Sequence, residues 1–481
     1  MVAAKAQCPD GTPPPCRAAA ARPPAPPPNS VAVLYFDNLS RDTADAFLAD
    51  GLTDELITRL SQVGRLQVKS RFASERARGH RAVDARELGR TLGAAYLVRG
   101  SLQEAGGRVR VNVALIQART GTQVWGEVYE RGGDLLAIQA EIARAVAGAI
   151  TGRLLPQERT ALGRLRTRDP AAYDLYLRGV GASYAFSEAG LRAALEFLDR
   201  AIAGDSGFAD AYAQKAVAWV NLADGYVDGR EGYARAREAA DRALHLDSSL
   251  AMAYAVLADA AVALDADALR ARWLAGRALA LDPASAWGHN ALMCALLLAG
   301  GAEDSVLVEA RRAWEADTLS EGFASQYLKA LAAMGRTDSI ATLLPRMAAV
   351  MHPDVTRAID GAVRLRRGDA AGAAERLSWS FYGGVLAAEY VRALVALGRR
   401  DGALAVVDSM IEATGRGYVN AFAVASACAV LGDADRAFVW LEHAWERRTL
   451  WLVWLRAWPD FVPLHTDPRW AALLRSMGLA S

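Results

Sequence analysis

Acidic side chains gather directly after the first strongly apolar segment, Val31 to Phe36. The members of this acidic group are Asp37, Asp42, Asp45, Asp50, Asp54 and Glu55. Carboxylates at the carboxyl end of a strand can bind a cation or transfer protons. The same residues also suit turns, a helix amino terminus and a solvated helix face, and the sequence places no basic or nucleophilic partner beside them. A metal-dependent enzyme that uses this group is therefore kept as an alternative hypothesis.

Other motifs with catalytic or metal-binding chemistry are missing from the sequence. It contains no glycine-rich G-x-G-x-x-G loop, no H-R-D, no D-F-G and no P-loop lysine. Its six histidines are scattered, and none is followed four residues later by another, so no helical zinc pair is predicted. The four cysteines form no C-x-x-C pair. We predict no catalytic residue, no cofactor and no metal, and hence a protein that is not an enzyme.

The cysteines fall into two kinds of segment. Cys294 and Cys428 lie in apolar helical segments and are expected to be small core residues. Cys8 and Cys16 lie in a proline-rich stretch and could form a disulfide only in an oxidising compartment.

Length and charge limit the class of protein. A chain of 481 residues is too long for one compact core, so several domains, or a domain with a repeat array, are expected. The 55 basic and 54 acidic residues nearly cancel, which gives no electrostatic case for nucleic-acid binding. No segment reaches the roughly 18 apolar residues of a membrane span, and the amino terminus lacks an apolar signal core. The sequence as written predicts a cytoplasmic protein, or a periplasmic one if a membrane segment lies upstream.

A cadence of small residues recurs between residues 194 and 318 and ends each time at a polar residue or a proline. The four passes are Ala194, Leu198, Ala201 and Ser206; Ala236, Ala240, Ala243 and Ser248; Ala271, Ala275, Ala278 and Pro283; and Val306, Ala310, Ala313 and Thr318. The stops are separated by 42, 35 and 35 residues. Small residues at i, i+4 and i+7 form one helix stripe that a neighbouring helix can approach closely. A period of this length predicts an array of helical repeats.

The cadence weakens after residue 318, but a turn signal keeps the period. This signal is a glycine followed five residues later by an apolar residue, and it occurs at Gly335, Gly368, Gly398 and Gly432. Half of the chain's 12 tryptophans lie in the closing segment, at Trp440, Trp445, Trp451, Trp454, Trp458 and Trp470. A terminal repeat must cover the last apolar face, so these rings are expected to form a cap rather than a ligand site. We therefore divide the array into well-preserved repeats at 171–318 and degenerate repeats with a tryptophan-rich cap at 319–481.

The amino-terminal part has a different organisation. Residues 1–29 hold nine of the 17 prolines and are predicted to be an extended, disordered tether. Beyond them the predicted elements are a strand at 31–36, a helix at 43–63, a strand at 66–69, a helix at 83–92, strands at 96–103, 108–117 and 124–129, and a helix capped by Asp134. This order, β-α-β-α-β-β-β-α, predicts an α/β domain with a mixed sheet over residues 30–155. Residues 156–170 are then a linker to an all-α array.

Several segments of this domain are similar to one known family. They are VAVLYFDNLS, FLADGLTDELITRLSQVGRLQV, ELGRTLGAAYLVRGSLQEAGGRVRVNVALIQARTGTQVWGEVYE and IQAEIARAVAGAI. In order and spacing they resemble the TolB amino-terminal-like domain that precedes tetratricopeptide repeats in many bacterial proteins. In that family the pair commonly follows a protein kinase, a nucleotide cyclase or a winged-helix regulator, often after a membrane helix. The resemblance implies a tetratricopeptide-repeat (TPR) solenoid after the linker, and a sensory or scaffolding part without its output domain.

The concave groove of the repeats is the remaining predicted binding surface. Counting from aromatic anchors in the first helix of each pair, the groove residues are Asp210, Val217, Asn221, Met252, Asp259, Val262, Leu292 and Leu296. A clamp for a terminal carboxylate needs Lys, Arg and Asn, and only Asn221 is of that kind. A largely apolar groove suits an amphipathic helix, from a partner or from this chain itself. It is an equally simple interpretation that these small residues only allow tight superhelical curvature.

Three functions follow from these observations. The first is a non-enzymatic scaffold or sensory module of a bacterial signalling system, which binds other proteins or amphipathic helices through the groove. The second is the C-terminal sensory part of a receptor-type Ser/Thr kinase or nucleotide cyclase whose catalytic domain is absent from this chain. The third is the metal-dependent enzyme that uses the acidic group.

Overall fold

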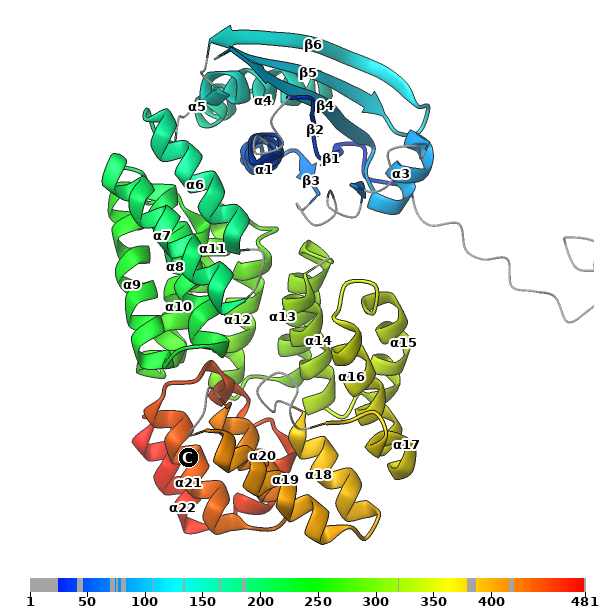
Figure 1. Cartoon of the computed structure of the whole chain (residues 1–481), viewed down its shortest axis with the longest axis vertical. Coiled ribbons are helices and arrows are strands. Elements are labelled where there is room, and N and C mark those ends of the chain that lie inside the picture. Colours follow the sequence, from blue (N-terminus) through cyan, green and yellow to red (C-terminus); the bar gives the residue numbers. More distant parts are fainter. Residues whose placement is uncertain are drawn as a thin grey trace, which may run out of the picture.

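The computed structural model describes most of the chain. The described residues are 25–40, 46–69, 74, 77–78, 84–106, 108–132, 135–163, 166–183, 187–318, 320–378, 386–414 and 419–479. The predicted tether up to residue 24, and with it Cys8, Cys16, Asp42, Asp45 and Asp134, lie outside these ranges. Within them the chain forms a small mixed sheet with helices, followed by many further helices (Figure 1).

A six-stranded sheet is the centre of the amino-terminal part, as far as the described residues extend. Its strands are β1 (Ser30–Val33), β2 (Asp37–Asn38), β3 (Gln67–Val68), β4 (Tyr96–Ala105), β5 (Arg108–Gln117) and β6 (Thr122–Gly132). The order across the sheet is β3-β1-β4-β5-β6, and β2 pairs with β4. Strand β1 is parallel to β3 and β4, whereas β4, β5 and β6 are antiparallel. The predicted mixed sheet is confirmed.

The predicted strand at 31–36 is divided in two. Strand β1 ends at Val33, and the chain pairs with β4 again only at Asp37. The ring of Phe36 lies over Gly100 of β4, where the Cβ atom of any other residue would collide with it. The backbone N–H of Phe36 donates a hydrogen bond to Thr53 Oγ1 at 3.2 Å. At Phe36, the packing of the ring on Gly100 and the hydrogen bond to Thr53 thus take the place of hydrogen bonds between strands.

Helices cover both faces of the sheet. They are α1 (Ala46–Ser61), α3 (Ala85–Leu92), α4 (Leu135–Thr151) and α5 (Pro156–Gly163). The buried side chains of Leu52 in α1 and Ile138 in α4 pack on one face with Val111 of β5, and Leu88 of α3 packs on the other face. This matches the period-two alternation of β5. Helix α5 lies in the predicted linker and packs against α1 and α4.

Helices make up the rest of the described chain. They are α6 (Pro170–Ser183), α7 (Glu188–Gly204), α8 (Ala209–Gly225), α9 (Gly229–Leu246), α10 (Ala251–Asp265), α11 (Ala268–Leu281), α12 (Ala286–Leu298), α13 (Glu303–Ala316), α14 (Glu321–Ala333), α15 (Thr337–Met347), α16 (Pro353–Arg366), α17 (Ala370–Ala374), α18 (Ala387–Ala396), α19 (Arg400–Ala413), α20 (Ala421–Val430), α21 (Ala434–Glu446), the 3-10 helices η3 (Leu450–Trp454) and η4 (Pro459–Leu464), and α22 (Pro468–Ser476). Consecutive helices pack against one another as pairs.

The small-residue cadence falls on the second helix of each pair. Its residues in α7, α9, α11 and α13 are all buried, with at most 1% of their surface exposed. In the later pairs the four turn glycines end the first helices α14, α16, α18 and α20, and each has a positive φ, between 68° and 89°. Glycine adopts this backbone region without the Cβ penalty of other residues. Each repeat of the sequence pattern, whether marked by small residues or by a turn glycine, therefore corresponds to one helix pair.

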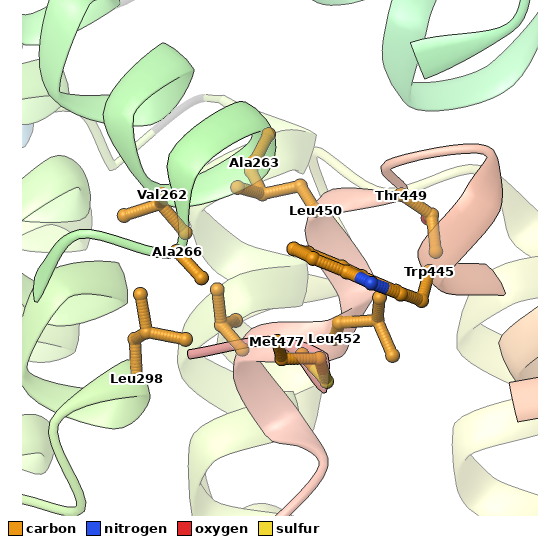
Figure 2. A pocket seen from close by; sticks show the side chains of 10 residues that line it. Val262, Ala263, Ala266, Leu298, Trp445, Thr449, Leu450, Leu452 and Met477 are labelled. Atoms are coloured by element: carbon orange, nitrogen blue, oxygen red, sulfur yellow. The ribbon is translucent and has the colours of Figure 1, made fainter. Parts of the chain in front are cut away.

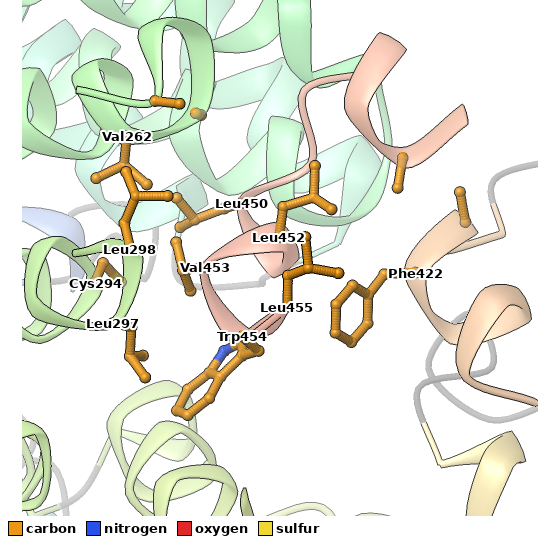
Figure 3. Close-up of a cluster of buried hydrophobic side chains, with 14 of the residues drawn as sticks. Val262, Cys294, Leu297, Leu298, Phe422, Leu450, Leu452, Val453, Trp454 and Leu455 are labelled. Carbon is orange, nitrogen blue, oxygen red and sulfur yellow. The ribbon is translucent and has the colours of Figure 1, made fainter. Parts of the chain in front are cut away.

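The chain returns on itself at its carboxyl end. In Figure 1 the sheet lies at one end of the long axis, and the C-terminal helices lie at the other, beside the ends of α8 to α12. The 3-10 helix η3 contacts α10 and α12. Figure 3 shows Val453 and Trp454 of η3 opposite Cys294 and Leu297 of α12, in one apolar core that joins α8 to α14 with α18 to α22.

Candidate functional site

The predicted acidic group does not form a metal site among the described residues. The carboxylate of Asp50 pairs with Arg78, and both side chains are part-exposed. Glu55 is buried and points away from solvent. No group of three or more His, Cys, Asp or Glu side chains in the described ranges could hold a metal ion.

Glu55 instead belongs to a buried ion-pair chain between the α/β domain and the first repeats. Its carboxylate lies 2.6 Å from Arg59 Nε and 2.7 Å from Arg166 Nε. Arg166 also pairs with Asp210 of α8, and Arg59 Nη1 donates to the carbonyl of Leu162 at 2.8 Å. Burial disfavours the charge on Arg166, but the carboxylates of Asp210 and Glu55 outweigh it and raise the pKa of this guanidinium. These ion pairs connect helix α1 with helix α8 through Arg166.

One predicted groove residue, Val262, lies against the chain's own C-terminal segment. Val262, a predicted groove residue, faces η3 together with Ala263 of α10 and Leu298 of α12. Figure 2 shows the pocket that remains between them, whose lining from the C-terminal side includes Trp445, Thr449, Leu450, Leu452 and Met477. The pocket is about the size of one water molecule. A small-molecule ligand does not fit there.

The groove positions predicted in α12 are out of register with those predicted in α10. Helices α10 and α12 begin at residues 251 and 286, so equivalent positions are 35 residues apart. The equivalents of Val262 and Ala263 are then Leu297 and Leu298, and these face η3 (Figure 3). Leu292 and Leu296 were assigned by taking Trp287 as the aromatic anchor, which shifted the register by two residues. With a step of 35 residues, the position equivalent to Tyr254 is His289 rather than Trp287.

The other predicted groove residues have different environments. Asp210 is paired with Arg166, and Val217 is buried in the core. Asn221 and Met252 are half-buried. Asp259 is buried with 1% of its surface exposed, and its Oδ1 atom has no hydrogen-bond partner. Val262 and Asp259 are thus both buried, whereas Asp210 lies at the junction with the α/β domain.

Asp259 is part of a group of titratable residues in the middle of the array. Asp259, Cys294 and Lys329 are each separated by 35 residues, the same step as the starts of α10, α12 and α14 at 251, 286 and 321. They therefore occupy one repeat position in three successive first helices. Tyr233 of α9 donates a hydrogen bond to Asp224 of α8 in the same region. The 35-residue step was visible in the sequence and could have identified this alignment.

Burial sets the protonation of this group. It raises the pKa of Asp259, to which the nearby charge of Asp224 adds, and it lowers the pKa of Lys329 to about 8. Desolvation also raises the pKa of Asp224 to about 6, although this side chain still reaches solvent. The Cys294 pKa is raised for the same reason, so the group stays a protonated thiol and a weak nucleophile at neutral pH. Lys329 Nζ lies 4.0 Å from the ring centroid of Trp451, a residue of η3.

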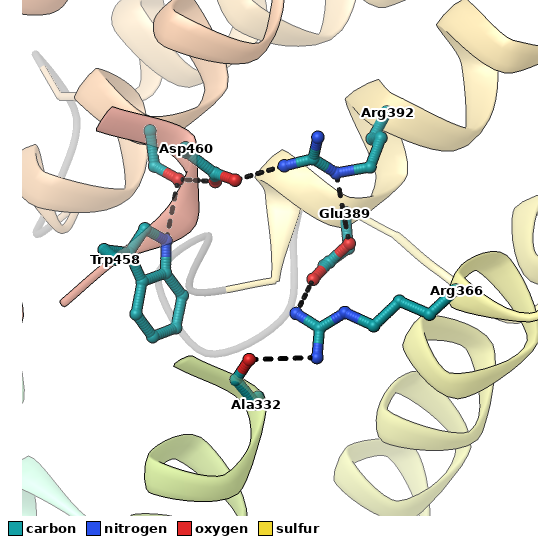
Figure 4. A network of polar contacts seen from close by, with 7 residues as sticks. Ala332, Arg366, Glu389, Arg392, Trp458 and Asp460 are labelled. Atoms are coloured by element: carbon teal, nitrogen blue, oxygen red, sulfur yellow. Dashed lines mark hydrogen bonds and ion pairs between the residues drawn. The ribbon is translucent and has the colours of Figure 1, made fainter. Parts of the chain in front are cut away.

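A second polar network ties the C-terminal cap to the later pairs (Figure 4). Glu389 of α18 accepts from Arg366 Nη2 of α16 at 2.8 Å and lies 3.5 Å from Arg392 Nε. Burial raises the pKa of Glu389 against the opposing effect of the two arginines. Arg392 also pairs with Asp460 of η4, and Trp458 Nε1 donates to Ser426 at 3.2 Å. The six tryptophans of this segment are buried or half-buried among apolar side chains.

Comparison with known proteins finds a relative that is similar to part of this chain. No known protein-family profile matches the sequence. A protein named "Putative adenylate cyclase 3", from Rhizobium meliloti strain 1021, is 36% identical to this chain over 189 residues. The aligned segment is 39% of this chain and 32% of that protein, so the chain spans about a third of the relative's length. In the described part of the chain, no helix has both the length and the apolar character needed to cross a membrane.

Proposed function

We propose that this chain is a non-enzymatic interaction and sensory module of a bacterial signalling system, built from a TolB amino-terminal-like domain and TPR repeats. The TPR assignment is supported by the helix pairs that start 35 residues apart at α10, α12 and α14. It is also supported by the buried small-residue stripes of the second helices. The order of strands and helices in residues 30–151 supports the domain assignment.

The observation that carries the sensory role is the buried ion-pair chain at the domain junction. Arg59, Glu55, Arg166 and Asp210 connect α1 of the α/β domain to α8 of the array. A buried charge that loses its partner is costly, so the two parts are expected to move together. A ligand or partner that shifts α1 would then shift the first helix pairs, which is a route from sensing to the repeat surface.

We do not expect a partner to bind in an open groove of the repeats. Because η3 packs against α10 and α12 beside Val262, a partner helix would reach Val262 only after η3 leaves. The repeats therefore act as a closed scaffold whose outer surface is available for partners.

A second candidate is the sensory part of a nucleotide cyclase whose catalytic domain is absent from this chain. The partial similarity to a protein named as an adenylate cyclase favours it. The two candidates differ in gene context: a transcript that joins this chain in frame to a catalytic domain supports the second.

A turnover assay tests the non-enzymatic role. The purified chain would be incubated with ATP or GTP and with Mg²⁺ or Mn²⁺, and cyclic nucleotides, released phosphate and phosphoprotein would be measured. We expect no turnover above buffer. Turnover that follows the protein through two further purification steps would replace this proposal with an enzyme.

A further inference from the structure

Helix α11 carries two large apolar side chains on its outer surface. Leu269 is 83% exposed and Trp273 is 62% exposed. They are four residues apart, so they lie on the same helix face. Tryptophan is mostly buried in folded proteins, and an exposed tryptophan beside an exposed leucine is a typical centre for protein binding.

The same face continues with small residues. Gly276 and Ala280 are exposed and follow Trp273 at helical spacing. A Cβ atom on Gly276 would meet no other atom within 4 Å, so no internal contact requires glycine there. Glycine inside a helix costs about 1 kcal/mol relative to alanine. A flat stripe of this kind allows the backbone of another helix to approach closely.

All the charged side chains of α11 are basic. Arg270, Arg272 and Arg277 are exposed, and the helix contains no acidic residue between Ala268 and Leu281. The second helices of the neighbouring pairs, α9 and α13, carry both acidic and basic residues. Within α11 the apolar stripe is therefore flanked by arginines alone, of which Arg270 lies 4.0 Å from Asp265, an exposed acid that precedes the helix.

We infer that the outer face of α11 binds an acidic amphipathic helix of a partner protein, an inference that rests on the proposed interaction function. Leu269 and Trp273 contact the apolar side of that helix, and Gly276 and Ala280 let it lie close. Arg270, Arg272 and Arg277 pair with its carboxylates. Tryptophan and arginine are the residue types that contribute most often to binding energy at interfaces.

Charge argues against two other occupants. A second copy related by a two-fold axis would bring the arginines of α11 opposite one another. A flat anionic membrane would also meet exposed acids of the neighbouring second helices, such as Glu238 and Asp241 in α9 and Glu303 and Asp304 in α13. A partner as narrow as one helix avoids these acids.

Fluorescence anisotropy with the full chain tests this inference. The probe is a labelled synthetic helix of about 18 residues, long enough to span α11, with leucines at i, i+3, i+4 and i+7 and glutamates on the other side. We expect saturable binding that weakens with salt. Trp273→Ala, and the double change Arg272→Glu with Arg277→Glu, are each expected to raise the Kd by about 10-fold or more.

Two variants separate binding from folding. Gly276→Gln introduces a better helix former, so stability should be equal or higher while its side chain obstructs the stripe and weakens binding. The charge-matched control is Arg200→Glu with Arg475→Glu, two exposed arginines of α7 and α22, which should leave the Kd unchanged.

Three results would overturn the inference. One is no binding of the acidic helix, or equal binding of a probe with lysine in place of glutamate. Another is binding to phosphatidylglycerol vesicles, lost in Trp273→Ala, without peptide binding, which would assign the face to lipid. The third is a concentration-dependent dimer that Trp273→Ala abolishes, which would assign it to a second copy. None of these results affects the turnover assay, so the proposed function is tested separately.

Discussion

Asp259 shows how one side chain can control the pH dependence of stability. Its carboxyl is buried, one of its oxygens has no hydrogen-bond partner, and its pKa is raised by burial and by the nearby charge of Asp224. The native state therefore holds a proton that the unfolded state releases once the pH exceeds the ordinary aspartate value of 3.8. Its contribution to stability is full below that pH and is lost as the pH rises through the native pKa.

Asp259→Asn should remove this pH dependence. At pH 8 we expect the variant to be about 1–3 kcal/mol more stable than the parent, because no buried carboxylate has to ionise or stay unpaired. Near pH 4 the two should be nearly equal. Urea unfolding between pH 4 and 8 measures the difference. Asp241→Asn, a change at an exposed position of α9, is the matched control. A constant offset at every pH would contradict the explanation.

At the scale of the element, the later pairs depend on glycines at the ends of their first helices. Gly398 ends α18 with a φ of 72°, and open space surrounds it. Backbone conformation alone therefore decides the effect of a substitution there.

Gly398→Ala should destabilise the chain by about 1 kcal/mol, because a Cβ atom disfavours the left-handed region. Gly276→Ala, inside α11 and equally open, should stabilise it by about 1 kcal/mol. Urea midpoints of the two variants give the comparison. If Gly398→Ala did not lower the midpoint, the turn would not need the conformational freedom of glycine.

The 3-10 helix η3 is the element on which closure of the array depends. Trp454 is 2% exposed and packs in the core shared with α12. We expect Trp454→Ala to cost about 3–5 kcal/mol, the usual range for deleting a buried large aromatic side chain. Val462→Ala in the exposed part of η4 should cost little. Equal costs in urea unfolding would mean that η3 does not contribute to the core.

At the scale of the whole molecule, the α/β domain and the array are joined by buried charge. Glu55→Gln would leave Arg59 and Arg166 without their common carboxylate, and we expect a loss of about 3–5 kcal/mol. Hydrogen exchange should rise in both α1 and α8, because the pair chain connects them. The control is Asp50→Asn, whose pair with Arg78 is part-exposed and should be worth less than about 1 kcal/mol. Faster exchange in α1 alone would argue against coupling.

Local patterns were sufficient for much of the architecture. The alternation in β5 predicted a half-buried strand, and the small-residue stripes and turn glycines predicted the helix pairs. Both signals depend on residues within one or two turns or strands of each other, so the sequence carries them directly. The same reasoning predicted Val262 as a groove residue, and in the structure it lies against η3.

Contacts between distant segments were decided only by the tertiary structure. Glu55 looked like one of several solvated acids, because nothing near it in the sequence points to Arg166. Leu292 and Leu296 are out of register with the positions predicted in α10, because their anchor Trp287 does not lie 35 residues after Tyr254. The sequence by itself determined the period of the helix pairs and the order of strands and helices along the chain, since local spacing encodes both. Which segment fills the groove, and which charges are buried together, followed only from the return of the chain at η3 and from the packing of α1 on the first repeats.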